Sequence, residues 1–119
     1  MSDAIVATRL QDGIWIVSLE GELTNENGYT LSQVYPWQNP EVVTDAVLFD
    51  MSRLSYINSA GIAALIRFVR EARRMGCESY AHGVSLHYQK IFRIVGLTGY
   101  MELFPDEYGA LETLQSRRK

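Results

Sequence analysis

The sequence of 119 residues has one cysteine, two histidines, three prolines and only two lysines beside nine arginines. One cysteine excludes an intramolecular disulfide, and Cys77 with two histidines offers too few soft ligands for a closed structural zinc site. No apolar run approaches the ~20 residues that a membrane-spanning helix needs. The acidic start, Met1-Ser2-Asp3-Ala4, does not resemble a signal peptide. A net charge of −3 and a pI near 5.3 give no general attraction to nucleic acid. We therefore expect a cytoplasmic protein in a reducing compartment, with no membrane and no direct nucleic-acid partner.

The motifs of common enzyme and cofactor sites are also missing. There is no G-x-x-x-x-G-K-[ST] and no G-x-G-x-x-G loop that would cradle a nucleotide. His82 and His87 lack the spacing of a metal site, and a histidine at a strand end or helix start is ordinary. Cys77 reads as a small buried hydrophobe, because nothing proposes a base to activate it. We expect no metal, no cofactor and no enzymatic activity.

What is present is a composition typical of one globular domain, with 47% hydrophobic and 21% charged residues. We predict a single domain over 1–119, with a core of about 4–115. The hydrophobic pattern predicts strands where β-branched and aromatic residues cluster, and helices where apolar residues recur at three and four. The predicted strands are 5–10, 14–20, 46–51, 78–82 and 101–104, and the predicted helices begin near residues 24, 59, 86 and 106.

The order of these elements, β-β-α-β-α-β-α-β-α, predicts an α/β fold. An opening hairpin at Asp12-Gly13 precedes alternating strands and helices, so we expect a mixed, mostly parallel sheet of about five strands with helices packed against it. Residues 52–58 read as a connection. The helix in 24–38 would be capped by Thr24 or Asn25 and ended by Pro36.

Some details of packing are also predicted. The helix 86–95 should bury Ile91, Ile94 and Val95 with Leu86 or Tyr88, and the last helix should carry Tyr108, Leu111 and Leu114. The tail 117–119 should be frayed.

The segment Ile57-Asn58-Ser59-Ala60-Gly61 is the candidate site. It follows a buried strand and opens a long helix, whose free amides can receive an anion such as a phosphoryl group on Ser59. The alternative is structural: Ser59 is only the N-cap of that helix, a role that serine fills well.

An arginine-rich helix face is the second candidate. Arg67, Arg70 and Arg74 share one face, whereas Arg73 falls beside the apolar side. The face is either solvated, with Glu71 pairing with Arg67, or a docking surface for an acidic partner. Tyr35 and Trp37 are either core residues or the rim of that surface.

Three stretches of the chain resemble the STAS domains of anti-sigma factor antagonists. Residues 46–65, with Asn58-Ser59-Ala60-Gly61, resemble the family pattern of a strand ending in Asp, a loop, and Asp-Ser-x-Gly opening a helix. Residues 83–97 resemble its Gly-Val-Ser turn and following helix, and Gly21-Glu22-Leu23 resembles its Gly-Glu-Leu motif. The likeness spans nearly the whole chain in the right order and implies the STAS fold.

The resemblance implies a binding module switched by reversible phosphorylation. In the family, an anti-sigma factor that is itself a GHKL-type serine kinase is bound by the unphosphorylated antagonist, and a PP2C-type phosphatase resets the cycle. Ser59 matches the phosphoacceptor, Asn58 stands where the family usually has Asp, and Thr24 replaces the Asp after Gly-Glu-Leu. The residues expected in the phosphorylation loop and partner surface are Thr24, Asn25, Glu26, Asn58, Ala60, Gly61, Arg67 and Arg70.

The absence of the two family acids leaves a second reading open. The chain is then a constitutive scaffold of a stress-signalling assembly, or a small regulatory subunit of an ABC transporter, without phosphorylation. For the switch, we expect a monomer or a weak homodimer.

Overall fold

The chain opens with an antiparallel hairpin of β1 (Ile5–Gln11) and β2 (Ile14–Leu23). In this computed structural model, which describes residues 4–118, Asp12 and Gly13 both take positive φ, 53° and 79°. Two consecutive positive φ values are what the tight turn of a twisted hairpin requires, so the predicted Asp-Gly turn is confirmed.

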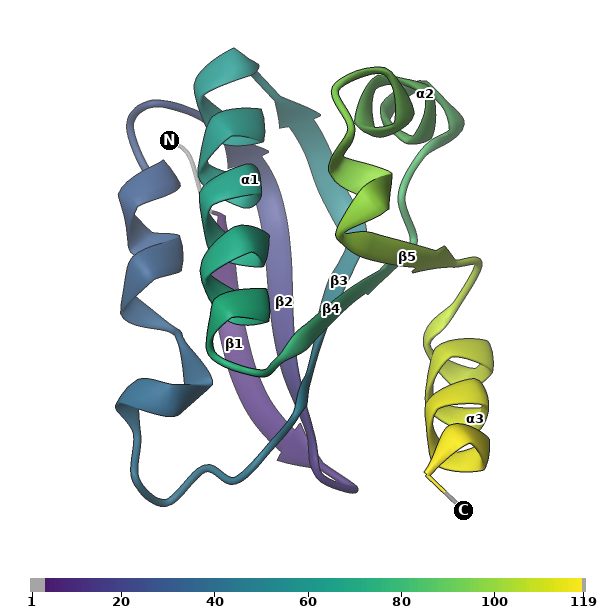
Figure 1. Ribbon diagram of the computed structural model, residues 1–119. Helices are drawn as coiled ribbons and strands as arrows, with labels where there is room; N and C mark the ends of the chain where they lie inside the picture. The colour runs from purple at the N-terminus through teal and green to yellow at the C-terminus, as the bar shows by residue number, and fades with distance from the viewer. Residues whose placement is uncertain (1–3, 119) are drawn as a thin grey trace.

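Three further strands extend the sheet in parallel: β3 (Ala46–Ile57), β4 (Glu78–His82) and β5 (Met101–Phe104). The spatial order is β1-β2-β3-β4-β5, with only the β1–β2 pair antiparallel. The expected mixed, mostly parallel sheet of five strands is confirmed (Figure 1).

Helices cover the two faces of the sheet unequally. The long helix α1 (Ser59–Arg74) lies across one face, with α2 (Leu86–Ile94) and the short 3₁₀ turn η3 (Leu97–Gly99) beside it (Figure 1). The final helix, α3 (Glu107–Arg117), packs on the opposite face. Along β3, Val47 and Phe49 face α1, whereas Ala46 and Leu48 face α3, as the period of two in a strand requires.

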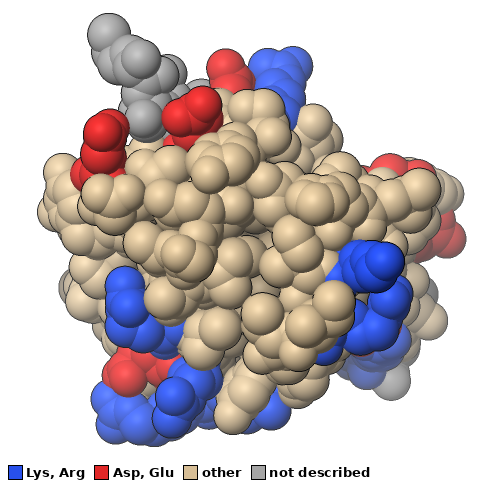
Figure 2. Space-filling model, turned by 90° about the horizontal axis from the view of Figure 1, so that it is seen from above, with Lys and Arg blue, Asp and Glu red and all other residues tan. Residues whose placement is uncertain are grey.

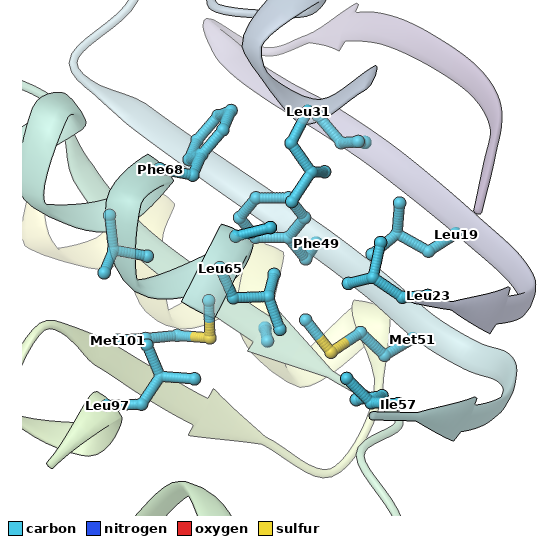
Figure 3. Packing of buried hydrophobic residues seen from close by; sticks show 14 of the residues in the cluster. Leu19, Leu23, Leu31, Phe49, Met51, Ile57, Leu65, Phe68, Leu97 and Met101 are labelled. Carbon is cyan, nitrogen blue, oxygen red and sulfur yellow. The ribbon is translucent and has the colours of Figure 1, made fainter. Parts of the chain in front are cut away.

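The larger core lies between the sheet and α1. Phe49 and Phe68 meet edge to face with their ring centroids 5.0 Å apart, and Leu65 fills the space beside them (Figure 3). All three side chains are 0% exposed. Burial of this apolar face fixes the rotation of α1 and thus decides which of its side chains reach solvent.

Residues 24–38 were predicted to contain an α-helix, and this prediction was wrong. The segment forms two 3₁₀ helices, η1 (Gly28–Gln33) and η2 (Pro36–Gln38), and Asn27 rather than Thr24 or Asn25 precedes the first. Tyr35 is extended, with ψ at 126°, because the following proline disfavours the helical region.

The strand β3 is longer than its apolar run. It continues through the polar residues 52–56, which were predicted to be a connection, and ends at Ile57. These residues pair with the second half of β2, from Glu20↔Arg53 to Leu23↔Ile57. The extension depends on backbone pairing with a neighbour, so hydrophobicity did not reveal it.

Two predicted helix faces need correction. On α2, Tyr88 and Phe92 are buried, whereas Ile94 and Val95 are exposed. On α3, Tyr108 is 77% exposed, and Ala110 and Leu114 are the buried residues.

The tail was also misjudged. Arg117 pairs with Glu102 at 2.8 Å, and Arg118 pairs with Asp45 at 2.6 Å, so the end of α3 is held to the sheet. Lys119 lies outside the described residues.

Within residues 4–118, no helix combines the length and the apolar character needed to cross a membrane.

Candidate functional site

The start of α1 is capped by Asn58. Its Oδ1 accepts a hydrogen bond from the Gly61 amide at 2.9 Å, and its carbonyl accepts the first helical bond from Ile62. Ser59 is the first helical residue and is exposed, so the expectation that Ser59 is the N-cap was wrong. Because Asn58 performs the capping, the Ser59 hydroxyl faces solvent with no such structural role.

The loop after β2 lies directly against this helix start. Asn58 donates its amide N–H to the Leu23 carbonyl at 3.2 Å, and its side-chain Nδ2 donates to Asn25 Oδ1 at 3.2 Å. The predicted residues Thr24, Asn25 and Asn58 are therefore brought together. An aspartate at position 58 could cap the helix but could not donate to Asn25.

Gly61 makes this close approach possible. A Cβ added there would lie 2.2 Å from the Leu23 carbonyl oxygen and 2.9 Å from Ile57 Cγ2. Both contacts are too short for any side chain, and the obstructing oxygen belongs to the backbone. The small residue predicted at this position is thus required for the loop to meet the helix.

Two residues that shape the site, Asn27 and Tyr88, were not predicted from the sequence. Asn27 accepts from the Thr24 amide at 2.9 Å and donates to the Glu22 carbonyl at 2.8 Å, which closes the loop on itself. Thr24 is itself buried, and its hydroxyl accepts from the Glu26 amide. Asparagine bonding to nearby backbone is a known turn signal, so Asn27 could have been predicted.

Tyr88 of α2 is the second residue that was missed. Its hydroxyl oxygen accepts a hydrogen bond from the Ile57 amide at 2.9 Å, just before the Asn58 cap. The contact spans 31 residues of sequence, so no local pattern predicts it. It fixes the first turn of α2 beside the start of α1.

The surface around Ser59 is largely uncharged at its centre. Figure 2 views the end of the molecule at which α1 begins, and Lys, Arg, Asp and Glu lie toward the rim of that face. The first turn of α1 contains no acidic residue. Two apolar residues near these positions in the sequence are exposed. Tyr56, two residues before Asn58, is 48% exposed, and Leu86, two residues before Tyr88, is 82% exposed.

Arg67 and Arg70 do not belong to this loop. They lie eight and eleven residues beyond Ser59, which places them about 12 and 16 Å further along the helix axis. With Arg74, Tyr35 and Trp37, they line a surface cavity of about 480 Å³, which we call the arginine pocket.

The aromatic residues serve both roles that were considered. Tyr35 and Trp37 stack at 4.4 Å and pack on the buried Phe68, yet they also form one wall of the arginine pocket. Burial and the nearby Glu71 carboxylate raise the pKa of Tyr35, and Arg67 opposes them. The hydroxyl of Tyr35 is therefore neutral and available as a hydrogen-bond donor at neutral pH.

The charges in the arginine pocket are paired differently from the prediction. Glu71 pairs with Arg74, not with Arg67. Among the described residues, Arg67 and Arg70 form no salt bridge. Arg73 instead lies over the Tyr100 ring at 4.4 Å, which agrees with its predicted place beside the apolar side.

Cys77 is buried, and burial, together with Asp45 and Glu78, raises the pKa of its thiol. A thiol of this kind is a poor nucleophile.

A model of the STAS domain matches residues 6–110. This chain belongs to the STAS-domain family. BtrV of Bordetella bronchiseptica, named as an anti-sigma factor antagonist, is 28% identical to this STAS domain over 94 residues, which is 79% of this chain and 78% of BtrV.

Solved structures show the same fold. The unphosphorylated anti-sigma factor antagonist SpoIIAA superposes with a TM-score of 0.71 at 18% identity, covering 92% of this STAS domain and 97% of SpoIIAA. Phosphorylated SpoIIAA, from Bacillus, gives 0.63 at 21% identity, over 91% and 99% of the two chains. A serine-to-glutamate variant of RsbS from Moorella thermoacetica gives 0.78 at 18% identity, over 95% and 97%.

Proposed function

We propose that this STAS domain is an anti-sigma factor antagonist whose partner binding is switched by phosphorylation of Ser59. The observation that carries the proposal is that three residues at the start of α1 have separate roles. Asn58 caps the helix, Gly61 admits the loop, and Ser59 is left exposed between them. The similarity of the chain to BtrV and to the two forms of SpoIIAA supports the same interpretation.

The free protein would tolerate a phosphate on Ser59. The amides of the first turn of a helix have no acceptor within the helix, and the positive end of the helix dipole favours an anion by about 0.3–1 kcal/mol. The first turn of α1 contains no acidic residue that would repel the phosphate. Replacement of the usual family Asp by Asn58 lowers the negative charge beside it further.

A partner bound over this face would not tolerate a phosphate on Ser59. The centre of the face in Figure 2 is uncharged. Tyr56 and Leu86, near the start of α1 in the chain and at the start of α2, are exposed and offer apolar contact area. Phosphorylation adds about −1.5 to −2 charges, which must lose their hydration when a partner covers them. The partner that the family resemblance implies is an anti-sigma factor that is also a serine kinase of the GHKL type, and a PP2C-type phosphatase would restore binding.

The arginine pocket would extend the partner surface. Arg67 and Arg70 carry positive charge and form no ion pair within the part of the chain that the structure describes, and the Tyr35–Trp37 stack gives a rigid wall. Arginine and tryptophan are enriched among residues that dominate binding energy. We assign this pocket to an acidic segment of the same partner.

The test compares binding of the cognate kinase to three forms of the chain: unmodified, Ser59→Ala, and phosphoserine incorporated at position 59. We expect the first two to bind alike and the third to lose at least about tenfold in affinity, as a desolvated charge of this size implies. The matched control is phosphoserine at position 55, an exposed serine whose hydroxyl donates to the Gly21 carbonyl. Equal affinity of all forms would contradict the switch.

Asn58 and Thr24, in place of the family acids, favour a second candidate: a constitutive scaffold or transporter subunit. In that case the phosphoserine-59 form would bind its partners unchanged, and the chain would join a large assembly. Size measurement of native complexes by light scattering distinguishes this candidate from a monomeric switch.

A further inference from the structure

Three ionisable side chains from distant parts of the sequence meet on the face of the sheet that carries α3. Asp50 lies on β3, His82 ends β4, and Glu107 begins α3. His82 Nε2 lies 3.7 Å from Asp50 Oδ1 and 3.7 Å from Glu107 Oε1, and all three candidate ligand atoms lie within 4.8 Å of one another. This group is separate from the Ser59 loop, since Ser59 begins the helix on the other face.

The buried histidine nitrogen is the feature that requires an explanation. His82 is only 5% exposed, and its Nε2 has no hydrogen-bond partner among residues 4–118. Buried polar atoms are almost always satisfied, so an unpartnered nitrogen directed at two carboxylates indicates a missing group between them. A lone pair on imidazole and two carboxylate oxygens form a donor set that binds a cation.

We propose that Asp50, His82 and Glu107 form a binding site for a divalent transition-metal ion, with Zn²⁺ as the best fit. Zinc accepts imidazole nitrogen and carboxylate oxygen at about 2.0–2.2 Å, which separates tetrahedral ligand atoms by about 3.3 Å. The two 3.7 Å distances from His82 Nε2 are a few tenths of an ångström longer than this, and the ligand atoms, which lie within 4.8 Å of one another, would approach by at most about 1.5 Å. Three protein ligands leave one position for water or a further ligand.

The Asp50 carboxylate is held in place for this role. Ser52 donates to its Oδ1 from both the hydroxyl, at 2.6 Å, and the amide, at 3.0 Å. Burial acts to raise the pKa of Asp50, but the Ser52 hydrogen bonds, with Arg53, bring it below its ordinary value. Since Oδ1 already accepts two hydrogen bonds, Oδ2 is the Asp50 oxygen with lone pairs free for a metal ion. Asp50 and Ser52 also line a cavity of about 250 Å³.

Arg9 limits how tightly this site would bind. Its Nη2 donates to both oxygens of Glu107 at 2.9 Å. Each carboxylate oxygen has a second lone pair, so Glu107 can keep Arg9 and still ligate a metal. With neutral His82, the two carboxylates and Arg9 leave one net negative charge, which favours a divalent cation. Removing Arg9 would tighten the site, because it removes a positive charge beside Glu107.

The competing explanation needs no metal. A protonated His82 would form an ion pair with both carboxylates, and the cluster would then be a purely structural link between the sheet and α3. Both explanations use the same residues, but only the metal site takes up zinc in a fixed ratio.

The experiment titrates Zn²⁺ into the chelator-treated full chain by isothermal calorimetry. We expect wild type to bind one equivalent, and His82→Gln and Glu107→Gln each to lose at least about tenfold in affinity. The matched control is His87→Gln, which changes the other, exposed histidine and should bind as wild type does. Arg9→Gln should bind more tightly than wild type.

Co²⁺ substitution supplies an independent readout. The visible absorption of bound Co²⁺ should appear in wild type and His87→Gln and be lost in His82→Gln. Circular dichroism of the metal-free variants verifies that they are folded, and the more exposed Glu107→Gln serves if His82→Gln does not fold. The proposal is overturned if wild type binds no Zn²⁺ below millimolar concentration, or if His82→Gln and Glu107→Gln bind it as well as wild type does. Neither result bears on the Ser59 switch, which has its own binding test.

Discussion

Asn58 occupies the position at which the STAS domains of anti-sigma factor antagonists usually have aspartate. Its contacts explain how an amide side chain caps the helix in place of a carboxylate. Asparagine and aspartate cap helices equally well, so the hydrogen bond to the Gly61 amide does not depend on charge. The additional bond to Asn25 depends on the amide hydrogens. The residue thus keeps the helix start intact while removing a negative charge next to Ser59.

The first prediction concerns this cap. Asn58→Ala should destabilise the protein by about 0.5–2 kcal/mol, the usual effect of losing an N-cap side chain. Asn58→Asp should retain most of the stability, because it loses only the bond to Asn25. Urea denaturation measures both, and equal losses for the two variants would show that the cap is not what holds the helix start.

The second prediction concerns Gly61. Gly61→Ala should cost about 1–3 kcal/mol or more, because its Cβ would overlap the Leu23 carbonyl oxygen and force the loop away from α1. Gly99→Ala is the matched control, since an added Cβ there meets nothing within 4 Å. Chemical denaturation of both variants tests the difference, and a Gly61→Ala variant as stable as Gly99→Ala would refute the close approach.

At the scale of elements, the start of α1 depends on its neighbours. The end of β2 supplies Leu23, the loop after it supplies Asn25, and α2 supplies the Tyr88 hydroxyl that accepts from the Ile57 amide. Because β2, β3 and α2 all converge on this end of α1, the position of Ser59 is fixed by three separate elements.

The third prediction tests the contribution of α2. Tyr88→Phe should destabilise by about 1–3 kcal/mol, since it leaves the buried Ile57 amide without an acceptor. Tyr29→Phe, which changes a 64% exposed tyrosine, should change stability by less than about 0.5 kcal/mol. Hydrogen exchange at the Ile57 amide should quicken in the first variant alone, and unchanged protection there would contradict the assignment.

The elements also show what sequence can predict. Apolar runs located all five strands, and helical periodicity located α1, α2 and α3. The polar half of β3 was missed because its pairing with β2 has no signature in its own side chains. The exposed Ile94 and Tyr108 were misassigned because only tertiary packing decides how a short helix is rotated.

The same distinction applies to the sites. The Asn58-Ser59-Ala60-Gly61 turn was predicted because its residues are contiguous. The contact of Tyr88 with Ile57 and the meeting of Asp50, His82 and Glu107 join residues far apart in sequence. Such groupings depend on sheet order and register, which one sequence does not reveal.

At the scale of the molecule, charge is distributed so that the two parts of the proposed partner surface differ. The face around Ser59 is uncharged at its centre, whereas the arginine pocket is basic in a protein of net charge −3 (Figure 2). We expect the first to provide most of the contact area and the second to steer an acidic partner into position.

The fourth prediction tests that steering. The double variant Arg67→Glu/Arg70→Glu should slow association with the partner kinase about tenfold or more at low salt, and the difference should shrink as salt is added. The control, Lys90→Glu/Arg93→Glu, makes the same change in net charge on α2. Stopped-flow association rates measure the effect, and equal slowing by both double variants would show that only net charge matters.

The central claim is that Ser59 is the residue that is phosphorylated. The most direct measurement is incubation of the chain with its cognate kinase and ATP, followed by mass analysis that locates the phosphate. The account predicts one phosphate on Ser59 and none on Ser59→Ala. Phosphate on another residue, or an unmodified chain while Ser59→Ala binds its partner normally, would contradict it.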